Sequence, residues 1–200
     1  AAKRTHEAAT AAMATSHPGE TEKIMADRVM ARMIANGADG TLFVVFGSGQ
    51  RTKLTHGMPT NRVPRESEII RFDIGGTFGP WMSDFARVYS TGNPTEIQQR
   101  SYRHLRDIEE EIVNFIHPGI TAEDVFHKAR KSFSIRGLPF HMPHVGHGLG
   151  MELHENPILR PGDRTVLQKG MVLNIEPLLM DETGSMYHLE DLIVVTDDGF

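Results

Sequence analysis

The sequence predicts an α+β fold built from two similar halves. The tripeptide His-Pro-Gly occurs at residues 17–19 and again at 117–119, an offset of 100 residues. Each copy precedes a helix-like segment that stops at a glycine, Gly37 in the first half and Gly137 in the second. Strand-like runs follow each helix. Repetition of a whole unit indicates a duplicated fold, with halves related by a pseudo-twofold axis and strands facing a shared cleft.

The individual elements follow from apolar spacing and from capping residues. The helix expected at 21–36 carries apolar residues along one stripe. Thr121 is placed to cap the helix at 122–136. Thr95 and Gln98 have the spacing of a capping box. The remaining expected elements are strands at 41–46, 68–74 and 84–89, a long helix at 96–116 between the halves, and strands at 171–176 and 190–196.

Composition narrows the class of protein. The chain has 200 residues, 39% of them hydrophobic and 24% charged, which predicts one globular domain over residues 1–200. A net charge of -5 gives no basic surface for nucleic acid, and no apolar run approaches the roughly 20 residues of a membrane span. Cysteine is absent, which excludes disulfides and thiolate ligands and favours a cytoplasmic location. Both ends of the sequence are abrupt, so we expect a fragment that lacks the extreme C-terminus of a longer protein.

Four acidic residues lie inside or at the ends of the expected strands: Asp73, Asp84, Glu176 and Glu190. Strand interiors disfavour acids, and an isolated buried charge is costly. Asp73 and Glu176 are 103 residues apart, and Asp84 and Glu190 are 106 apart, so the acids follow the repeat. Two related hairpins would bring four carboxylates around one point. Two divalent cations would balance that charge, and we therefore predict a metal site.

A histidine supplies the fifth candidate ligand. Residues 141–150 are dense in histidine and glycine, and His147 stands between two glycines that allow close approach of the backbone. A rival interpretation is a separate zinc site made by His141, His144 and His147. Steps of three residues along a strand would place alternate histidines on opposite faces, which argues against that site.

These residues resemble the pita-bread metallopeptidases, which include methionine aminopeptidases, Xaa-Pro dipeptidases and Xaa-Pro aminopeptidases. The resemblance covers nearly all 200 residues, and the step of 14 residues from Glu176 to Glu190 is similar to the Xaa-Pro branch. The matching motifs are Phe72-Asp73-Ile74-Gly75 through Ser83-Asp84-Phe85-Ala86-Arg87, Gly146-His147-Gly148-Leu149-Gly150 with His154-Glu155-Asn156-Pro157, Gly170-Met171 through Ile175-Glu176-Pro177, and Glu190-Asp191.

The resemblance implies a pita-bread (creatinase/aminopeptidase-like) fold, with strands lining a central metal cleft and helices outside. It implies two divalent metal ions per chain, bridged by Asp84 and Glu190. Asp73 would complete one ion, and His147 with Glu176 would complete the other. The oxygen-rich ligand set favours Mn²⁺ over Co²⁺, Zn²⁺ or Fe²⁺. It also implies a short peptide substrate, a separate N-terminal domain that this sequence lacks, and a homodimer of the full-length protein.

The implied activity is hydrolysis of the N-terminal peptide bond, with Xaa-Pro peptides as substrates. Glu176 would act as general base and then acid. His154 would contact the scissile carbonyl or the substrate beyond it. His56, in the loop Thr55-His56-Gly57, would line the cleft as a third catalytic residue.

Three departures from the Xaa-Pro pattern touch substrate handling. Pro143 stands where these enzymes usually have histidine, with His144 beside it. His188 stands where they usually have arginine, and Leu178 where glycine is common. We therefore assign His144 and His188 to substrate binding. Two alternatives stay open: a non-peptide hydrolase or lyase of the same fold, creatinase-like or sulfonium-lyase-like, and a non-catalytic binding module.

Overall fold

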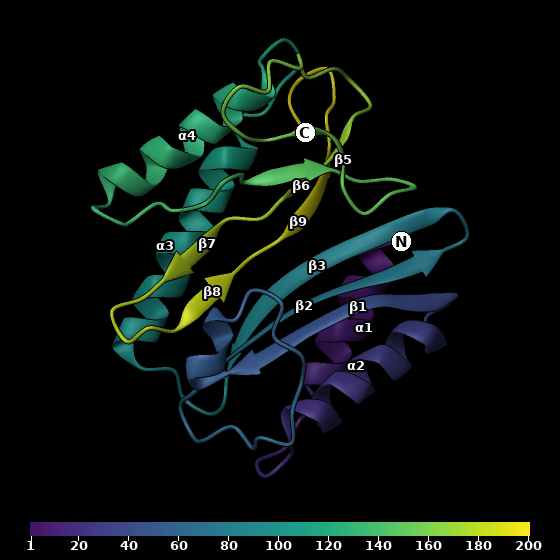
Figure 1. Ribbon diagram of the computed structural model, residues 1–200, viewed down its shortest axis with the longest axis vertical. Coiled ribbons are helices and arrows are strands. Elements are labelled where there is room, and N and C mark those ends of the chain that lie inside the picture. Colours follow the sequence, from purple (N-terminus) through teal and green to yellow (C-terminus); the bar gives the residue numbers. More distant parts are fainter.

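The computed structural model describes residues 1–200 as two halves, each with a pair of helices outside a sheet (Figure 1). None of its helices combines the length and apolar character of a membrane span. The first half contains α1 (Ala2–Met13), α2 (Glu22–Ala35), β1 (Gly40–Ser48), the 3-10 helix η1 (Gly49–Lys53), β2 (Ile69–Phe78) and β3 (Trp81–Ser90). The second half contains α3 (Glu96–Val113), α4 (Ala122–Ile135), β4 (Gly146–Gly148), β5 (Glu155–Ile158), β6 (Val172–Ile175), β7 (Leu178–Met180), β8 (Met186–His188) and β9 (Asp191–Val194).

The repeat is confirmed at the level of capping residues. Helices α2 and α4 each have 14 residues. Thr21 and Thr121 cap them, and each side chain accepts a hydrogen bond from a backbone N–H of the first turn. Both helices stop before a glycine of positive φ, 91° at Gly37 and 65° at Gly137. The same local chemistry therefore starts and ends the same element twice.

One expectation about the helices is wrong. The long helix does not lie between the halves, because α3 is the first helix of the second half and corresponds to α1. The two helices end at Met13 and Val113, again 100 residues apart. The sequence did not indicate α1, since its buried face is made largely of alanine and gives a weak apolar stripe. The capping box of Thr95 and Gln98 at the start of α3 is confirmed.

The duplication extends to the strands. One antiparallel sheet has the order β1-β2-β3, the other has the order β5-β4-β6-β9, and β7 pairs with β8 separately. In the first sheet, Val45 is opposite Asp73. In the second, the backbone N–H of Glu176 donates to the carbonyl of Val145 at 3.0 Å. The two acids therefore occupy equivalent positions beside equivalent strands.

Strands β2 and β3 are longer than expected, and Gly75 explains why. The strands were expected at 68–74 and 84–89, yet pairing continues to Phe78 and Trp81. A Cβ at Gly75 would lie 2.4 Å from the Phe43 ring, so this glycine permits close packing inside a continuous strand. The short strands β4, β5, β7 and β8 were not expected, because three or four residues show no clear periodicity.

Alternation of side chains along the strands separates the cores from the inner faces. Phe72 and Ile74 of β2 pack in the core beneath α1 and α2. Leu173 and Ile175 of β6 pack in the core beneath α3 and α4. Asp73 lies between two of these core residues in sequence, so its side chain projects from the opposite face of the sheet. That face is where the two halves meet.

Candidate metal centre

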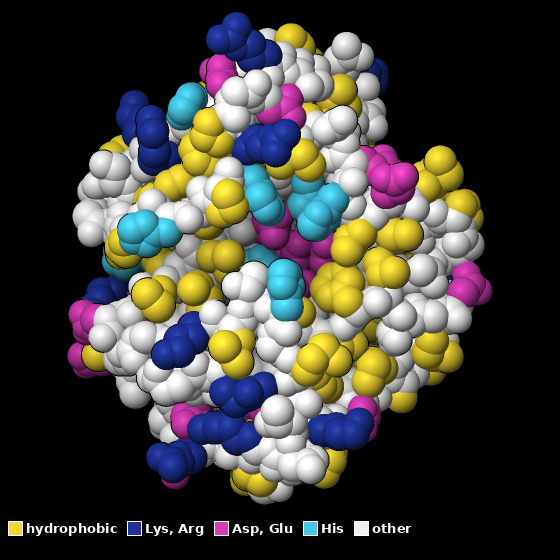
Figure 2. All heavy atoms as spheres, in the orientation of Figure 1, with side chains coloured by type: hydrophobic (Ala, Val, Ile, Leu, Met, Phe, Trp, Pro, Cys, Tyr) yellow, Lys and Arg dark blue, Asp and Glu magenta, His cyan; other side chains and the backbone are white.

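Strands from both sheets bring the predicted ligand residues together. Asp73 and Asp84 come from β2 and β3, and His147 comes from β4. Glu176 directly follows β6, and Glu190 directly precedes β9. Figure 2 shows acidic side chains grouped near the centre of one face of the molecule, with histidines beside them. Three overlapping groups have ligand atoms within 4.8 Å of one another: Asp84, His147 and His154; His147, Glu176 and Glu190; Asp73, His188 and Glu190.

His147 is oriented toward the acids by its other ring nitrogen. Its Nδ1 lies 3.0 Å from the carbonyl oxygen of Gly148, which can only accept a hydrogen bond. Nδ1 therefore carries the proton, and the lone pair of Nε2 is free. Nε2 lies 3.5 Å from Glu176 Oε1 and 3.9 Å from Asp84 Oδ2. This is the arrangement by which a backbone carbonyl orients a ligand histidine.

Unpaired polar atoms test whether these residues fit a metal. Buried polar atoms almost always have a hydrogen-bond partner. Here each of the five predicted ligands has one buried atom with no such partner. All five atoms are lone-pair donors, so a cation satisfies them where another acceptor would not. The atoms are Asp73 Oδ1, Asp84 Oδ1, His147 Nε2, Glu176 Oε1 and Glu190 Oε2.

The carboxylates also need positive charge. Burial, reinforced by repulsion from Asp73 and Glu176, raises the pKa of Asp84 to about 9. Burial raises the pKa of Asp73 to about 7, although Arg71 opposes the shift. Burial and the charges of Asp84 and Asp73 raise the pKa of Glu190 well above its ordinary value. Protons neutralise this cluster when no cation is bound, and divalent ions would take their place.

Glu176 differs from the other acids because histidines surround it. Burial alone would raise its pKa, but the nearby imidazole of His144 holds the pKa below the ordinary value. His144 Nδ1 lies 3.2 Å from Glu176 Oε1, and the carboxylate raises the pKa of His144. His188 Nε2 lies 3.8 Å from Glu176 Oε2. An ionised carboxylate is the form that can accept a proton.

The remaining predicted residues differ in how close they come to the acids. The exposed ring of His154 lies 4.1 Å from the ring of His147, at an interplanar angle of 52°. His56 is exposed in the loop after η1 and joins none of the three groups. His141 is also exposed and joins no group, so the rival three-histidine zinc site is not assembled.

Two buried residues beside the acids were not expected from the sequence. Arg71 is only 3% exposed, and its Nη2 lies 4.0 Å from Asp73 Oδ2. Asn174 donates a hydrogen bond to the side chain of Glu190. Each lies two residues before a candidate ligand, Arg71 before Asp73 and Asn174 before Glu176. Period-two spacing along a strand was the signal that could have identified them.

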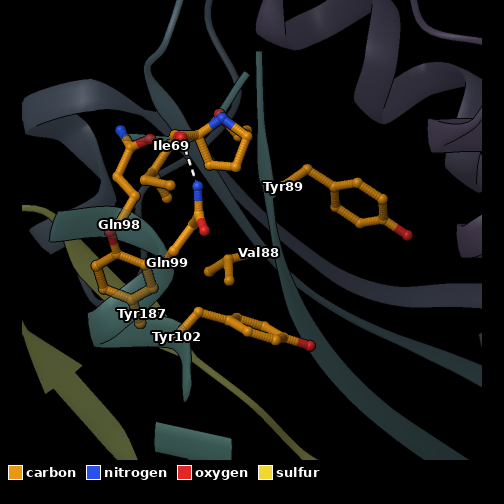
Figure 3. Close-up of a pocket in the computed structure, with 9 residues that line it drawn as sticks. Ile69, Val88, Tyr89, Gln98, Gln99, Tyr102 and Tyr187 are labelled. Atoms are coloured by element: carbon orange, nitrogen blue, oxygen red, sulfur yellow. Dashed lines mark hydrogen bonds between the residues drawn. The ribbon is translucent and has the colours of Figure 1, made fainter. Parts of the chain in front are cut away.

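A separate pocket of about 280 Å³ lies between β3 and the start of α3 (Figure 3). Ile69, Val88, Tyr102 and Tyr187 contribute its largely apolar lining. No acid or histidine faces it, so it offers neither metal ligands nor a group that titrates near neutral pH. The ionisable chemistry of the molecule is concentrated between the two sheets instead.

Comparison with known proteins identifies the family to which this chain is similar. Metallopeptidase family M24 matches residues 1–197. The probable dipeptidase PepE of Mycobacterium tuberculosis (strain ATCC 25618 / H37Rv) is 36% identical over 184 residues, covering 91% of this chain and 49% of the relative. The Xaa-Pro dipeptidase of Pyrococcus furiosus is 31% identical over 184 residues, covering 90% and 53%.

A solved structure agrees with the sequence relatives. The X-Pro aminopeptidase from Thermotoga maritima MSB8 superposes with a TM-score of 0.92 at 26% identity, covering 98% of this chain and 56% of that one. The chain thus spans about half the length of the relatives it matches. The match across residues 1–197 and the shared architecture lead to one conclusion. The chain belongs to metallopeptidase family M24 and has the pita-bread fold of that family.

Proposed function

We propose that residues 1–200 form the catalytic domain of a dinuclear exopeptidase that removes the N-terminal residue of short peptides when proline is second. The observation that carries this proposal is the convergence of five unpaired ligand atoms between the two sheets. An Xaa-Pro dipeptidase and an X-Pro aminopeptidase among the similar proteins support the substrate class. The proposal extends to a homodimer of the full-length protein, and the absence of cysteine favours a cytoplasmic location.

The ligand roles follow from position. Asp84 and Glu190 come from opposite sheets and are proposed to bridge two ions, most favourably Mn²⁺ given the oxygen-rich set. Asp73 would bind one of the two ions, and His147 with Glu176 would bind the other. Two divalent ions would supply Lewis-acid polarisation of the scissile carbonyl and activation of water.

The protein's own side chains would then manage protons and orientation. Glu176 is ionised among its histidines and would accept the proton of the attacking water, then deliver it to the leaving nitrogen. The ring of His154 lies beside that of His147, and His154 would donate to the oxygen that gains charge. His144 and His188, on either side of Glu176, would orient the carboxylate and contact the substrate. His56 would bind substrate from its exposed loop.

A substrate panel tests the proposal directly. Mn²⁺-loaded full-length protein would be offered an Xaa-Pro dipeptide, a longer Xaa-Pro peptide, a Met-Ala peptide and an Xaa-Ala control, with release of the N-terminal residue measured. We expect cleavage only next to proline, and length preference would separate a dipeptidase from an aminopeptidase. Glu176→Gln serves as the inactive control. Two bound ions without cleavage of any peptide would contradict the peptidase assignment and favour non-peptide chemistry.

A further inference from the structure

Arg71 occupies an unusual place for an arginine. It lies on β2 two residues before Asp73, so both side chains project from the inner face of the sheet. Only 3% of Arg71 is exposed, and arginine is rarely buried so completely unless it is paired. Its guanidinium has partners on two sides, a loop on one and an acid on the other.

On the loop side, Arg71 binds three backbone carbonyl groups. Nη1 donates to the carbonyl oxygens of Thr52 at 2.8 Å and Leu54 at 3.3 Å. Nη2 donates to the carbonyl oxygen of Thr55 at 3.0 Å. These three residues end η1 and lead into His56. One planar, rigid guanidinium therefore fixes the path of the segment that presents His56.

On the acid side, Arg71 is the permanent positive charge closest to the carboxylates. Its Nη2 lies 4.0 Å from Asp73 Oδ2, and no other arginine or lysine forms an ion pair with a predicted ligand. His188 Nδ1 approaches the same oxygen at 3.9 Å. Arg71 therefore provides the fixed charge beside Asp73.

We propose that Arg71 is a positioning residue that couples the segment at 52–55 to the Asp73 side of the metal centre. Because the guanidinium is held by three carbonyls, it cannot follow Asp73 if that carboxylate turns away. Displacement of the segment equally moves the positive charge that faces Asp73. The inference rests on the proposed function, since it assigns a metal-binding consequence to Asp73.

Arg51 provides a matched control on the same loop. Its Nη2 donates to the carbonyl of Met58 at 2.6 Å, and its Nε lies 3.1 Å from the buried carboxylate of Glu22. Arg51 forms no ion pair with Asp73 or any other predicted ligand. Its removal should loosen the loop without altering the surroundings of Asp73.

The test combines hydrogen exchange of the amides at 52–57 with calorimetric titration of Mn²⁺ into metal-free full-length protein. For Arg71→Met we expect faster exchange and Mn²⁺ affinity reduced by about 10–100-fold, the usual effect of losing a group that orients a ligand. For Arg51→Met we expect faster exchange with Mn²⁺ affinity within about twofold of wild type. Arg71→Lys keeps the positive charge but loses the planar set of donors that binds several carbonyls. Amide exchange should therefore become faster, and Mn²⁺ affinity should fall by about threefold or more.

The outcomes separate this inference from the proposed function. Unchanged Mn²⁺ affinity in Arg71→Met would overturn the inference, as would an equal loss in Arg51→Met. If Arg71→Met does not fold, Arg71→Lys decides, because unchanged exchange and affinity there would also overturn it. Failure of the wild-type protein to bind Mn²⁺ would instead contradict the proposed function itself.

Discussion

The two halves of the molecule share a framework but differ in the side chains that surround their acids. In the first half, β2 and β3 have ten residues each and contribute Asp73 and Asp84. In the second half, β6 and β9 have four residues each, and β7 and β8 lie between them along the chain. An arginine lies beside the first pair of acids, whereas histidines surround Glu176. Duplication preserved where the acids stand, and their neighbours diverged.

This divergence separates two kinds of carboxylate. Asp73 and Asp84 have raised pKa values of about 7 and 9, so they need a cation to ionise fully. Glu176 has a lowered pKa because histidines face it. Glu176 is therefore suited to accepting a proton, whereas Asp73, Asp84 and Glu190, which come from both halves, are suited to holding metal.

The largest effect should come from the two proposed bridging acids, one in each half. Asp84→Asn and Glu190→Gln should each bind fewer than two ions and reduce turnover by more than about 100-fold, the upper range for indirect partners of a ligand. Metal analysis of purified protein and the peptide assay would measure both effects. Glu109→Gln is the control, because Glu109 is buried outside the three groups. If either variant retained two ions, the assignment of one bridging ligand to each half would be wrong.

Loss of His154 should separate proton and charge handling from metal binding. His154→Ala is expected to lower kcat by about 100-fold while leaving two ions bound, because it removes a donor to the developing charge. His56→Ala should have a smaller effect, expressed mainly in KM, since His56 joins no metal group. Steady-state kinetics with parallel metal analysis would measure this. Loss of an ion in His154→Ala would show that this side chain is a ligand instead.

The pH dependence of stability should differ between the metal-free and metal-bound protein. In the metal-free protein, Asp73 and Asp84 have folded pKa values above their unfolded values, so the native state holds more protons and its stability falls as pH rises. We expect the metal-free Tm to fall by about 5 °C or more between pH 5.5 and 8.5. Added Mn²⁺ should reverse most of the loss at high pH. If calorimetry showed that the Tm of the metal-free protein rises with pH, the raised pKa values of Asp73 and Asp84 would be contradicted.

The smallest effect concerns Glu109, a buried carboxyl of α3 in the second half. Burial, with repulsion from Asp191, raises its pKa to about 8. Its protonated form stabilises the fold below that pH, and the contribution disappears as pH rises through about 8. The free energy of unfolding of Glu109→Gln, measured relative to wild type, should therefore increase by on the order of 1 kcal/mol between pH 6 and pH 9. Urea unfolding at both pH values would measure it, and a constant difference would count against the shift.

The sequence could predict what is encoded locally. The capping threonines and terminal glycines of α2 and α4 mark both helices, and the acids at offsets of 103 and 106 mark the centre. What escaped prediction depends on tertiary contact. The alanine-rich face of α1 becomes meaningful only when it packs, and Arg71 is informative only once its loop carbonyls are known. The position of His56 outside the metal groups likewise depends on the path of its loop.

The equivalence of Asp73 and Glu176 beside Val45 and Val145 has a consequence for how the site comes into being. Neither half alone contains a complete ligand set, since one offers two acids and the other offers His147 with two glutamates. The metal centre thus forms only where the two halves meet. A chain cut in the connection at 91–95 would give complementary fragments, and divalent ions would be expected to favour their reunion.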